Sequence, residues 1–149
     1  MSKYRIIKDY EQALMLIQDI IGANITNNEQ LTRLGNLLFN SDYLGSFPSN
    51  KMPKYIKENQ CFILNTDSSR SSNKYGHWVA FYKINSKLYY YDSFSRPIDK
   101  LSKLWKNRRL YNANTSDRDQ SYEEKSCGSR AMAFLVLIRK YGEKCINVV

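Results

Sequence analysis

The chain has 149 residues, 42% of them hydrophobic and 13% aromatic, which is enough apolar material for one compact core and excludes a chain disordered throughout. It carries 23 Lys and Arg against 14 Asp and Glu, and the net charge of +9 makes an anionic partner a reasonable expectation. The longest apolar run, residues 131–138, is far shorter than the ~20 residues that a membrane-spanning helix needs, so we expect no membrane partner.

Hydrophobic periodicity predicts a series of helices and strands with no repeat or linker between them, so we expect a single domain over residues 1–149. The first half is predicted to contain, in chain order, a helix over 9–22, a second helix through Leu31 and Leu38, a loop over 40–53, a buried strand over 60–66 and a polar loop over 67–76. The second half is predicted to contain strands over 77–84 and 87–92, a short helix over 97–106, a strand over 109–114, a polar loop over 114–125 and an apolar helix over 127–141 that Gly142 ends. Thr26 and Glu29 are expected to form a capping box, in which side chains and backbone amides exchange hydrogen bonds, at the start of the second helix.

The single histidine of the chain, His77, begins the first strand of a predicted hairpin. If that hairpin turns between Ile84 and Lys87, its register puts Asp92 opposite Val79. His77 shares a face with Val79, which makes Asp92 its diagonal neighbour at roughly 7 Å between backbones. A carboxylate there can orient the imidazole and favour its protonated form, as an acid does for a catalytic base. A lone histidine is more often structural, and this neighbour is what favours a catalytic role.

Cys127 lies where the polar loop ends and the last apolar helix begins. Free amides and the positive end of the helix dipole favour a thiolate at such a position. Gly128 has no side chain and leaves the neighbouring amides open to an approaching carbonyl group. Because a cysteine paired with a histidine can have a pKa of about 3–4, we expect Cys127 and His77 to form a nucleophile near neutral pH. The alternative is a buried cysteine that opens a core helix.

The polar loop before Cys127 also contains a glutamine that could take part in catalysis. Gln120 lies seven residues before Cys127, and its amide can donate to the oxyanion of a tetrahedral intermediate together with the Cys127 backbone amide. A solvated loop glutamine is the alternative.

The three cysteines show neither an even disulfide framework nor a metal-binding spacing, so at least one thiol should be free. We expect Cys61 in the core and Cys145 partly exposed.

These features together resemble the adenovirus-type maturation proteases, the adenain family, whose fold is shared more distantly by the SUMO- and ubiquitin-like-protein proteases. Four segments carry the resemblance, which spans residues 47–137: Ile-Leu-Asn-Thr at 63–66, Gly-His-Trp-Val-Ala-Phe at 76–81, Tyr-Tyr-Asp-Ser-Phe at 90–94, and Gln120 followed after six residues by Cys127-Gly128. The resemblance implies a triad of His77, Asp92 and Cys127 with Gln120 in the oxyanion hole, and it implies that Trp78 packs beside the imidazole. We therefore predict an α+β fold with a central mixed sheet flanked by helices and the nucleophile at a helix N-terminus.

The resemblance also implies a biological setting. It suggests a viral enzyme, with a virophage or Polinton-like element as one source, that cleaves virion structural precursor proteins and needs no cofactor for its chemistry. We expect it in the virion and inside the infected cell, in the cytoplasm or nucleus, and the N-terminal residues contain no secretory signal. Adenain is activated by a peptide disulfide-linked to a cysteine between the acid and the nucleophile. This chain has no cysteine between Asp92 and Cys127, so we do not expect that activation.

A basic stripe follows the hairpin. Its residues are Lys100, Lys103, Lys106, Arg108 and Arg109, and their spacing in a predicted helix would put them on one side. Adenain binds DNA as a stimulating cofactor, and the resemblance implies that this stripe could do the same. Such binding would be salt-sensitive and indifferent to sequence, because no base-reading motif is present. A solvated charged face is the alternative.

The leading hypothesis from the sequence is a cysteine endopeptidase. One alternative is an isopeptidase that removes a ubiquitin-like modifier with the same triad. Another is a basic, nucleic-acid-binding virion protein without turnover, in which Cys127 would react no faster at pH 6 than an ordinary thiol. An acyltransferase with the same three residues is a more distant alternative.

Overall fold

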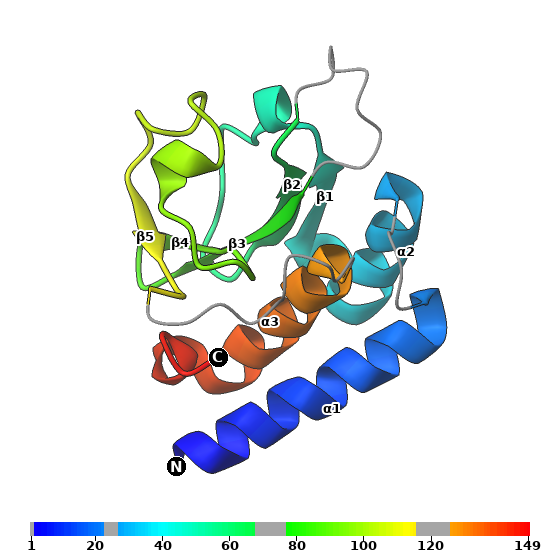
Figure 1. Ribbon diagram of the computed structural model, residues 1–149. Coiled ribbons are helices and arrows are strands. Elements are labelled where there is room, and N and C mark those ends of the chain that lie inside the picture. Colours follow the sequence, from blue (N-terminus) through cyan, green and yellow to red (C-terminus); the bar gives the residue numbers. More distant parts are fainter. Residues whose placement is uncertain (1, 23–26, 68–76, 116–125) are drawn as a thin grey trace.

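The computed structural model describes residues 2–22, 27–67, 77–115 and 126–149. Within these ranges the chain forms three α-helices and one five-stranded sheet (Figure 1). The helices are α1 (Lys3–Ile21), α2 (Asn28–Phe39) and α3 (Cys127–Tyr141), and the strands are β1 (Tyr43–Phe47), β2 (Cys61–Asn65), β3 (Trp78–Ile84), β4 (Lys87–Tyr91) and β5 (Leu110–Asn112). This mixture of helices and a sheet is consistent with the predicted α+β class. No helix in the described ranges is long and apolar enough to span a membrane.

The five strands lie in chain order across the sheet, and their directions are mixed as predicted. The outer pairs, β1 with β2 and β4 with β5, are parallel, whereas β2, β3 and β4 are antiparallel neighbours. The β3–β4 hairpin has the predicted register, with Ile84 opposite Lys87 and Ala80 opposite Tyr91. The start of β3 and the end of β4 therefore lie at the same end of the sheet.

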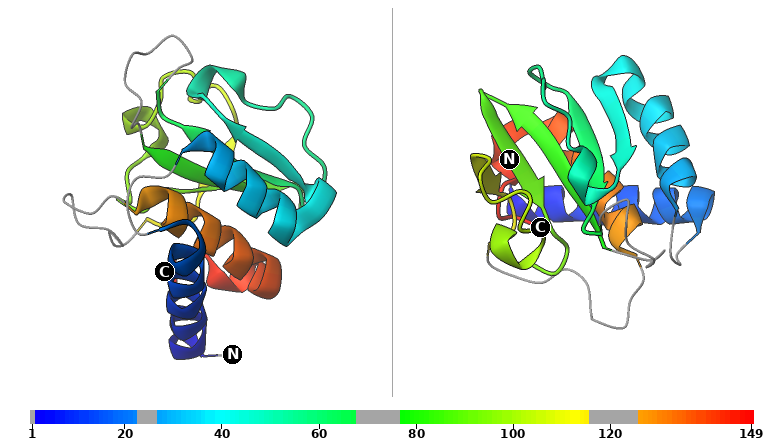
Figure 2. Two further views of the ribbon diagram at one scale, coloured as in Figure 1. Left: turned by 90° about the vertical axis from the view of Figure 1, so that its right-hand side faces the viewer. Right: turned by 90° about the horizontal axis from the view of Figure 1, so that it is seen from above.

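Both faces of the sheet are buried, and alternate residues of each strand face opposite sides. One face packs on the helices, with Cys61 and Ile63 of β2 among its members. Phe62 and Leu64 face the other way, toward a second apolar cluster that contains Trp105. Helix α3 lies between the sheet and α1 (Figures 1 and 2). The helices therefore flank the sheet on one face, and an irregular segment covers the other.

The first helix begins six residues earlier than the predicted start at residue 9. Ser2 is its N-cap, and the Ser2 side chain accepts a hydrogen bond from the Arg5 amide at 3.3 Å. The buried positions Ile6 and Tyr10 extend the apolar stripe toward the N-terminus. The cap was missed because Lys3 and Arg5 interrupt the apolar pattern in the first turn.

The predicted capping box of α2 is wrong by one residue. Asn27 and Gln30 form it, with the Gln30 amide donating to Asn27 Oδ1 at 2.8 Å and the Asn27 amide donating to Gln30 Oε1 at 3.0 Å. Glu29 pairs instead with Arg33 on the helix surface, and Thr26 lies outside the described residues. Both pairs have the same spacing, and Asn is as good an N-cap as Thr, so the sequence alone did not separate them.

Strand β1 lies inside the range 40–53 that was predicted to be loop. Its register with β2 shifts between Tyr43 and Ser46, and Gly45 there has φ 139°, a conformation that other residues rarely adopt. A glycine at such a break is typical of a β-bulge. Gly45 therefore made the segment resemble a loop in the sequence, although it lies inside a strand.

The predicted helix over 97–106 is also wrong. Only Ile98–Lys100 is helical, as one 3-10 turn, and the chain continues in turns. Leu101 and Trp105 are buried against the sheet, and Trp105 Nε1 donates to the Ser49 carbonyl at 2.9 Å. Their spacing fits a helix, but the docking of two large side chains onto the sheet decides the backbone path here.

The remaining elements match more closely. Strands β2 and β5 lie within their predicted ranges, and α3 has the predicted bounds, with Gly142 as its C-cap at φ 64°. The predicted loops over 67–76 and 114–125 lie largely outside the described residues.

Candidate active site

Three residues predicted to act together meet where three elements begin or end. His77 directly precedes β3, Asp92 directly follows β4, and Cys127 is the first residue of α3. His77 Nε2 hydrogen-bonds Asp92 Oδ1, so the predicted contact is confirmed. The Cys127 thiol lies close enough to the same imidazole to raise its pKa, and the imidazole in turn lowers the pKa of the thiol. Because Nε2 is engaged by the acid, Nδ1 is the ring nitrogen left for the sulfur.

Asp92 is fully buried and surrounded by hydrogen-bond donors. Besides His77, the Phe94 amide reaches Oδ1 at 3.2 Å, and the Arg96 amide and Nε reach Oδ2 at 2.9 and 3.0 Å. Burial alone would raise the pKa of Asp92, but its contacts with His77 and Arg96 prevail and lower the pKa to about 2. The acid is therefore ionised at neutral pH.

The backbone around Asp92 is fixed as firmly as its side chain. The Asp92 carbonyl accepts hydrogen bonds from the Ser95 amide at 2.9 Å and from Asn114 Nδ2 at 3.1 Å. Ser95, at φ 56°, closes this turn and donates through Oγ to the Asn114 carbonyl at 2.8 Å. The turn therefore directs the carboxylate back toward the start of β3.

His77 is held on both its backbone and its ring. Its amide donates to Thr66 Oγ1 at 3.2 Å, and the Thr66 amide donates to its carbonyl at 2.8 Å. The Phe94 ring lies beside the imidazole, with the centroids 4.9 Å apart. Burial would lower the pKa of His77, but the hydrogen bonds and charges of Asp92 and Cys127 outweigh it and raise the pKa above its ordinary value.

Cys127 is partly buried at the N-terminus of α3. Burial would raise the pKa of its thiol, but the hydrogen bond and charge of His77 lower it, as do the backbone amides of Trp78 and Gly128, and the net shift is downward. A raised imidazole pKa and a lowered thiol pKa together favour an imidazolium–thiolate pair.

A second set of polar contacts connects the start of α3 to α1. Arg130 Nε donates to Oγ of Ser126, the N-cap of α3, at 3.1 Å, and Arg130 Nη1 donates to the Tyr10 hydroxyl at 3.4 Å. The Tyr10 and Tyr91 hydroxyls are hydrogen-bonded at 2.9 Å. Tyr91 in turn stacks on Phe134 of α3, with ring centroids 4.5 Å apart. These contacts fix the end of β4 and the start of α3 relative to each other.

Other residues of the predicted site have different outcomes. Gln120 lies outside the described residues, so its place in an oxyanion hole stays a prediction. Trp78 is buried in the helix-facing core, while shielding of the imidazole by its indole stays a prediction.

Sequence reasoning missed Phe94 and Arg96. Phe94 lies two residues after Asp92, the usual position of an amide that bonds an aspartate side chain at a turn, and this was the one available indication; nothing in the sequence indicated the bond from Arg96.

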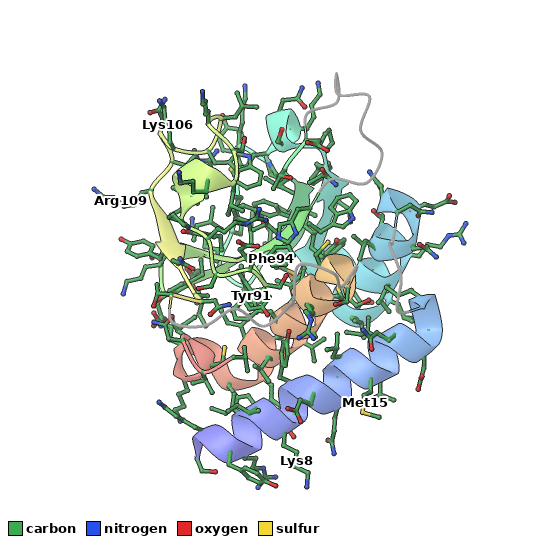
Figure 3. The ribbon with its side chains drawn as sticks, viewed as in Figure 1. Lys8, Met15, Tyr91, Phe94, Lys106 and Arg109 are labelled. Carbon is green, nitrogen blue, oxygen red and sulfur yellow. The ribbon has the colours of Figure 1, made fainter. Side chains whose placement is uncertain are left out.

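The basic stripe does not have the predicted helical geometry. Lys106 and Arg109 project outward from the side of the molecule that bears β5 (Figure 3). Lys100 and Lys103 are exposed on the same segment, where Lys100 ends the single 3-10 turn and no longer helix follows to align the basic side chains. Arg109 and its neighbour Arg108 also line an open surface pocket of about 240 Å³, whose wall includes two lysines, Lys54 and Lys83. Among the described residues, no group of three or more His, Cys, Asp or Glu side chains could hold a metal ion.

The other two cysteines are both fully buried. This confirms the core position of Cys61, whereas the expected partial exposure of Cys145 is wrong. The Cys145 thiol donates to the Gly142 carbonyl at 3.3 Å within a short 3-10 helix, whose turn folds the tail back against the core. Burial raises the pKa of both thiols to about 12.

The three thiols should therefore differ sharply in reactivity. At pH 6 we expect iodoacetamide to label Cys127 in the folded protein and to leave Cys61 and Cys145 unlabelled until urea unfolds the chain. The reason is that the thiolate is the reactive form and only Cys127 has a lowered pKa. Mass mapping of the labelled peptides over time measures the three rates. Equal rates for the three thiols, or no reaction at Cys127, would contradict this assignment.

The chain was compared with models of protein families and with curated proteins, and neither comparison found a match. The chemistry of the site itself is therefore the guide to function. In it an ionised acid, a buried imidazole of raised pKa and a thiol of lowered pKa contact one another in series. These are the components of a nucleophile, a general base and an orienting acid.

Proposed function

We propose that this protein is a cysteine endopeptidase with an adenain-like fold that cleaves viral structural precursor proteins. The observation that carries the proposal is the position of the His77 imidazole between the Asp92 carboxylate and the Cys127 thiol at the start of α3. The resemblance to the adenain family supports the choice of substrate and of location, which we propose to be the virion and the interior of the infected cell.

In the first half of the reaction, the Cys127 thiolate attacks the scissile carbonyl carbon and a tetrahedral oxyanion forms. The oxyanion collapses, the C–N bond breaks, and the leaving amine takes a proton from the His77 imidazolium. The product is a thioester between Cys127 and the N-terminal fragment. Asp92 keeps its negative charge throughout and stabilises the imidazolium.

In the second half, His77 accepts a proton from a water molecule that attacks the thioester. The C–S bond breaks, the N-terminal fragment leaves as a carboxylic acid, and the thiolate–imidazolium pair is restored. We propose that the amide of Gln120 and the backbone amide of Cys127 stabilise the two oxyanions. DNA held by the basic surface would act as a salt-sensitive stimulator, without a part in the chemistry.

The test is incubation of the purified protein with the structural precursors encoded by the same genome, with and without DNA. Mass mapping of new termini is expected to show a few defined cuts that iodoacetamide pretreatment of the enzyme prevents. Cleavage only of conjugates of a ubiquitin-like modifier would replace the endopeptidase by an isopeptidase. DNA binding without any new terminus would favour the non-catalytic virion protein.

A further inference from the structure

We propose that Arg96 is a positioning residue of this site, holding the acid against the imidazole and the Phe94 ring against its face. The inference rests on the proposed function, because positioning has a consequence only if His77 and Cys127 catalyse a reaction. Arg96 does not contact the sulfur in the described structure and acts through Asp92 and Phe94.

The first contact fixes the plane of the carboxylate. Asp92 Oδ1 faces His77, and Arg96 occupies Oδ2 twice, through its backbone amide at 2.9 Å and its Nε at 3.0 Å. Rotation of the carboxylate would break the bonds to His77 and to Arg96 together. A donor pair on one oxygen thus keeps the other oxygen directed at the ring.

The second contact restrains the ring itself. The guanidinium carbon of Arg96 lies 5.0 Å from the centroid of the Phe94 ring, within the range of a cation–π contact. The Phe94 ring in turn lies 4.9 Å from the imidazole centroid. Phe94 also donates its amide to Asp92 Oδ1 at 3.2 Å. Arg96 therefore stabilises both groups that limit the motion of the His77 ring.

The charge of Arg96 has a separate, measurable effect. Among the described residues, the titratable groups that face His77 are Asp92 and Cys127, and Arg96 reaches the imidazole through Asp92. The negative charge of Asp92 faces two cations, the imidazolium of His77 and the guanidinium of Arg96. When the Arg96 charge is removed, the carboxylate acts on the imidazolium alone, and the proton of His77 is held more strongly. The alkaline limb of the pH–rate profile should then move to higher pH.

The test compares Arg96→Gln and Arg96→Lys with a matched control, Arg139→Gln. The Arg139 side chain is 41% exposed and that of Arg96 35%, and each side chain makes one carboxylate contact and one cation–π contact. Arg139 pairs with Asp42 at 3.2 Å, away from the site. We expect Arg96→Gln to lower kcat, by up to roughly 100-fold, with KM little changed, since a small misplacement of a catalytic group has this effect. Arg139→Gln should keep the kcat of the unmodified protein.

The two substitutions of Arg96 separate geometry from charge. Arg96→Lys keeps the charge but not the planar guanidinium, so it should retain the alkaline limb and recover only part of kcat. Arg96→Gln should shift that limb of the cleavage rate to higher pH, because cleavage needs the protonated imidazole as its general acid. A substitution that only loosened the fold would lower kcat without moving the alkaline limb of the pH–rate profile.

Near-UV circular dichroism and thermal melting, compared with Arg139→Gln, show whether each variant is folded. A folded Arg96→Gln with unchanged kcat and limb overturns the proposal. If that variant does not fold, Arg96→Lys decides, because a kcat equal to that of the unmodified protein overturns the proposal as well. If Cys127 of the unmodified protein lacks reactivity at pH 6, the proposed function fails, and the positioning role fails with it. If Cys127 is reactive but the Arg96 variants keep the kcat and the pH–rate profile of the unmodified protein, the positioning role alone is refuted.

Discussion

Cys127→Ala is expected to reduce proteolysis by at least roughly 10⁴-fold, because no other group in the site can form the thioester. The protein should stay folded, since the thiol is only partly buried and alanine suits the first turn of α3. Mass mapping of precursor fragments measures the loss of cleavage, and thermal melting measures the free energy of unfolding.

Cys61→Ala is the matched control for that substitution. Cys61 is fully buried in the helix-facing core, so its loss should lower the free energy of unfolding by about 1–2 kcal/mol through a small cavity. Its distance from the site along β2 should leave cleavage intact at a temperature where the variant is folded. The two variants thus separate activity from stability, and undiminished cleavage by Cys127→Ala would end the protease proposal.

The parts of the site that the sequence predicted depend on local rules. The turn between Ile84 and Lys87 determines the register of the hairpin, and the register brings Asp92 near His77. Likewise, the change from polar to apolar residues marks Cys127 as the first residue of α3. Each inference needed only neighbouring residues along the chain.

The contacts that join these local pieces were not predictable in the same way. Arg130 bonds Ser126 four residues before it, but its bond to Tyr10 spans most of the chain and depends on the packing of α1 against α3. Parallel pairing of β1 with β2 is similarly non-local, and Gly45 at its bulge made the strand resemble a loop. Arg96 follows a turn closed by Ser95 at positive φ, and a propensity for such a turn does not specify which side chain returns to the acid.

His77→Ala should lower cleavage nearly as much as Cys127→Ala, because it removes the general base and the cation that stabilises the thiolate. Burial then acts on Cys127 without its main compensation, so the pKa of the thiol rises and at pH 6 the thiol is protonated. The rate of iodoacetamide labelling at pH 6 should fall accordingly and recover only as the pH is raised. Stopped-time labelling followed by mass mapping measures this rate without a substrate.

The effect of this substitution on folding should be modest. Asp92 keeps three donors after the loss of His77, namely the Phe94 amide, the Arg96 amide and Arg96 Nε, so its buried charge stays compensated. Asp92→Asn provides the graded comparison: it should lose less cleavage than His77→Ala if the acid orients the ring and stabilises its charge without accepting a proton. After this substitution the groups that still stabilise the thiolate are the helix N-terminus and the amides of Trp78 and Gly128. If His77→Ala is labelled at Cys127 as fast as the unmodified protein at pH 6, these groups suffice, and the imidazole does not activate the thiol.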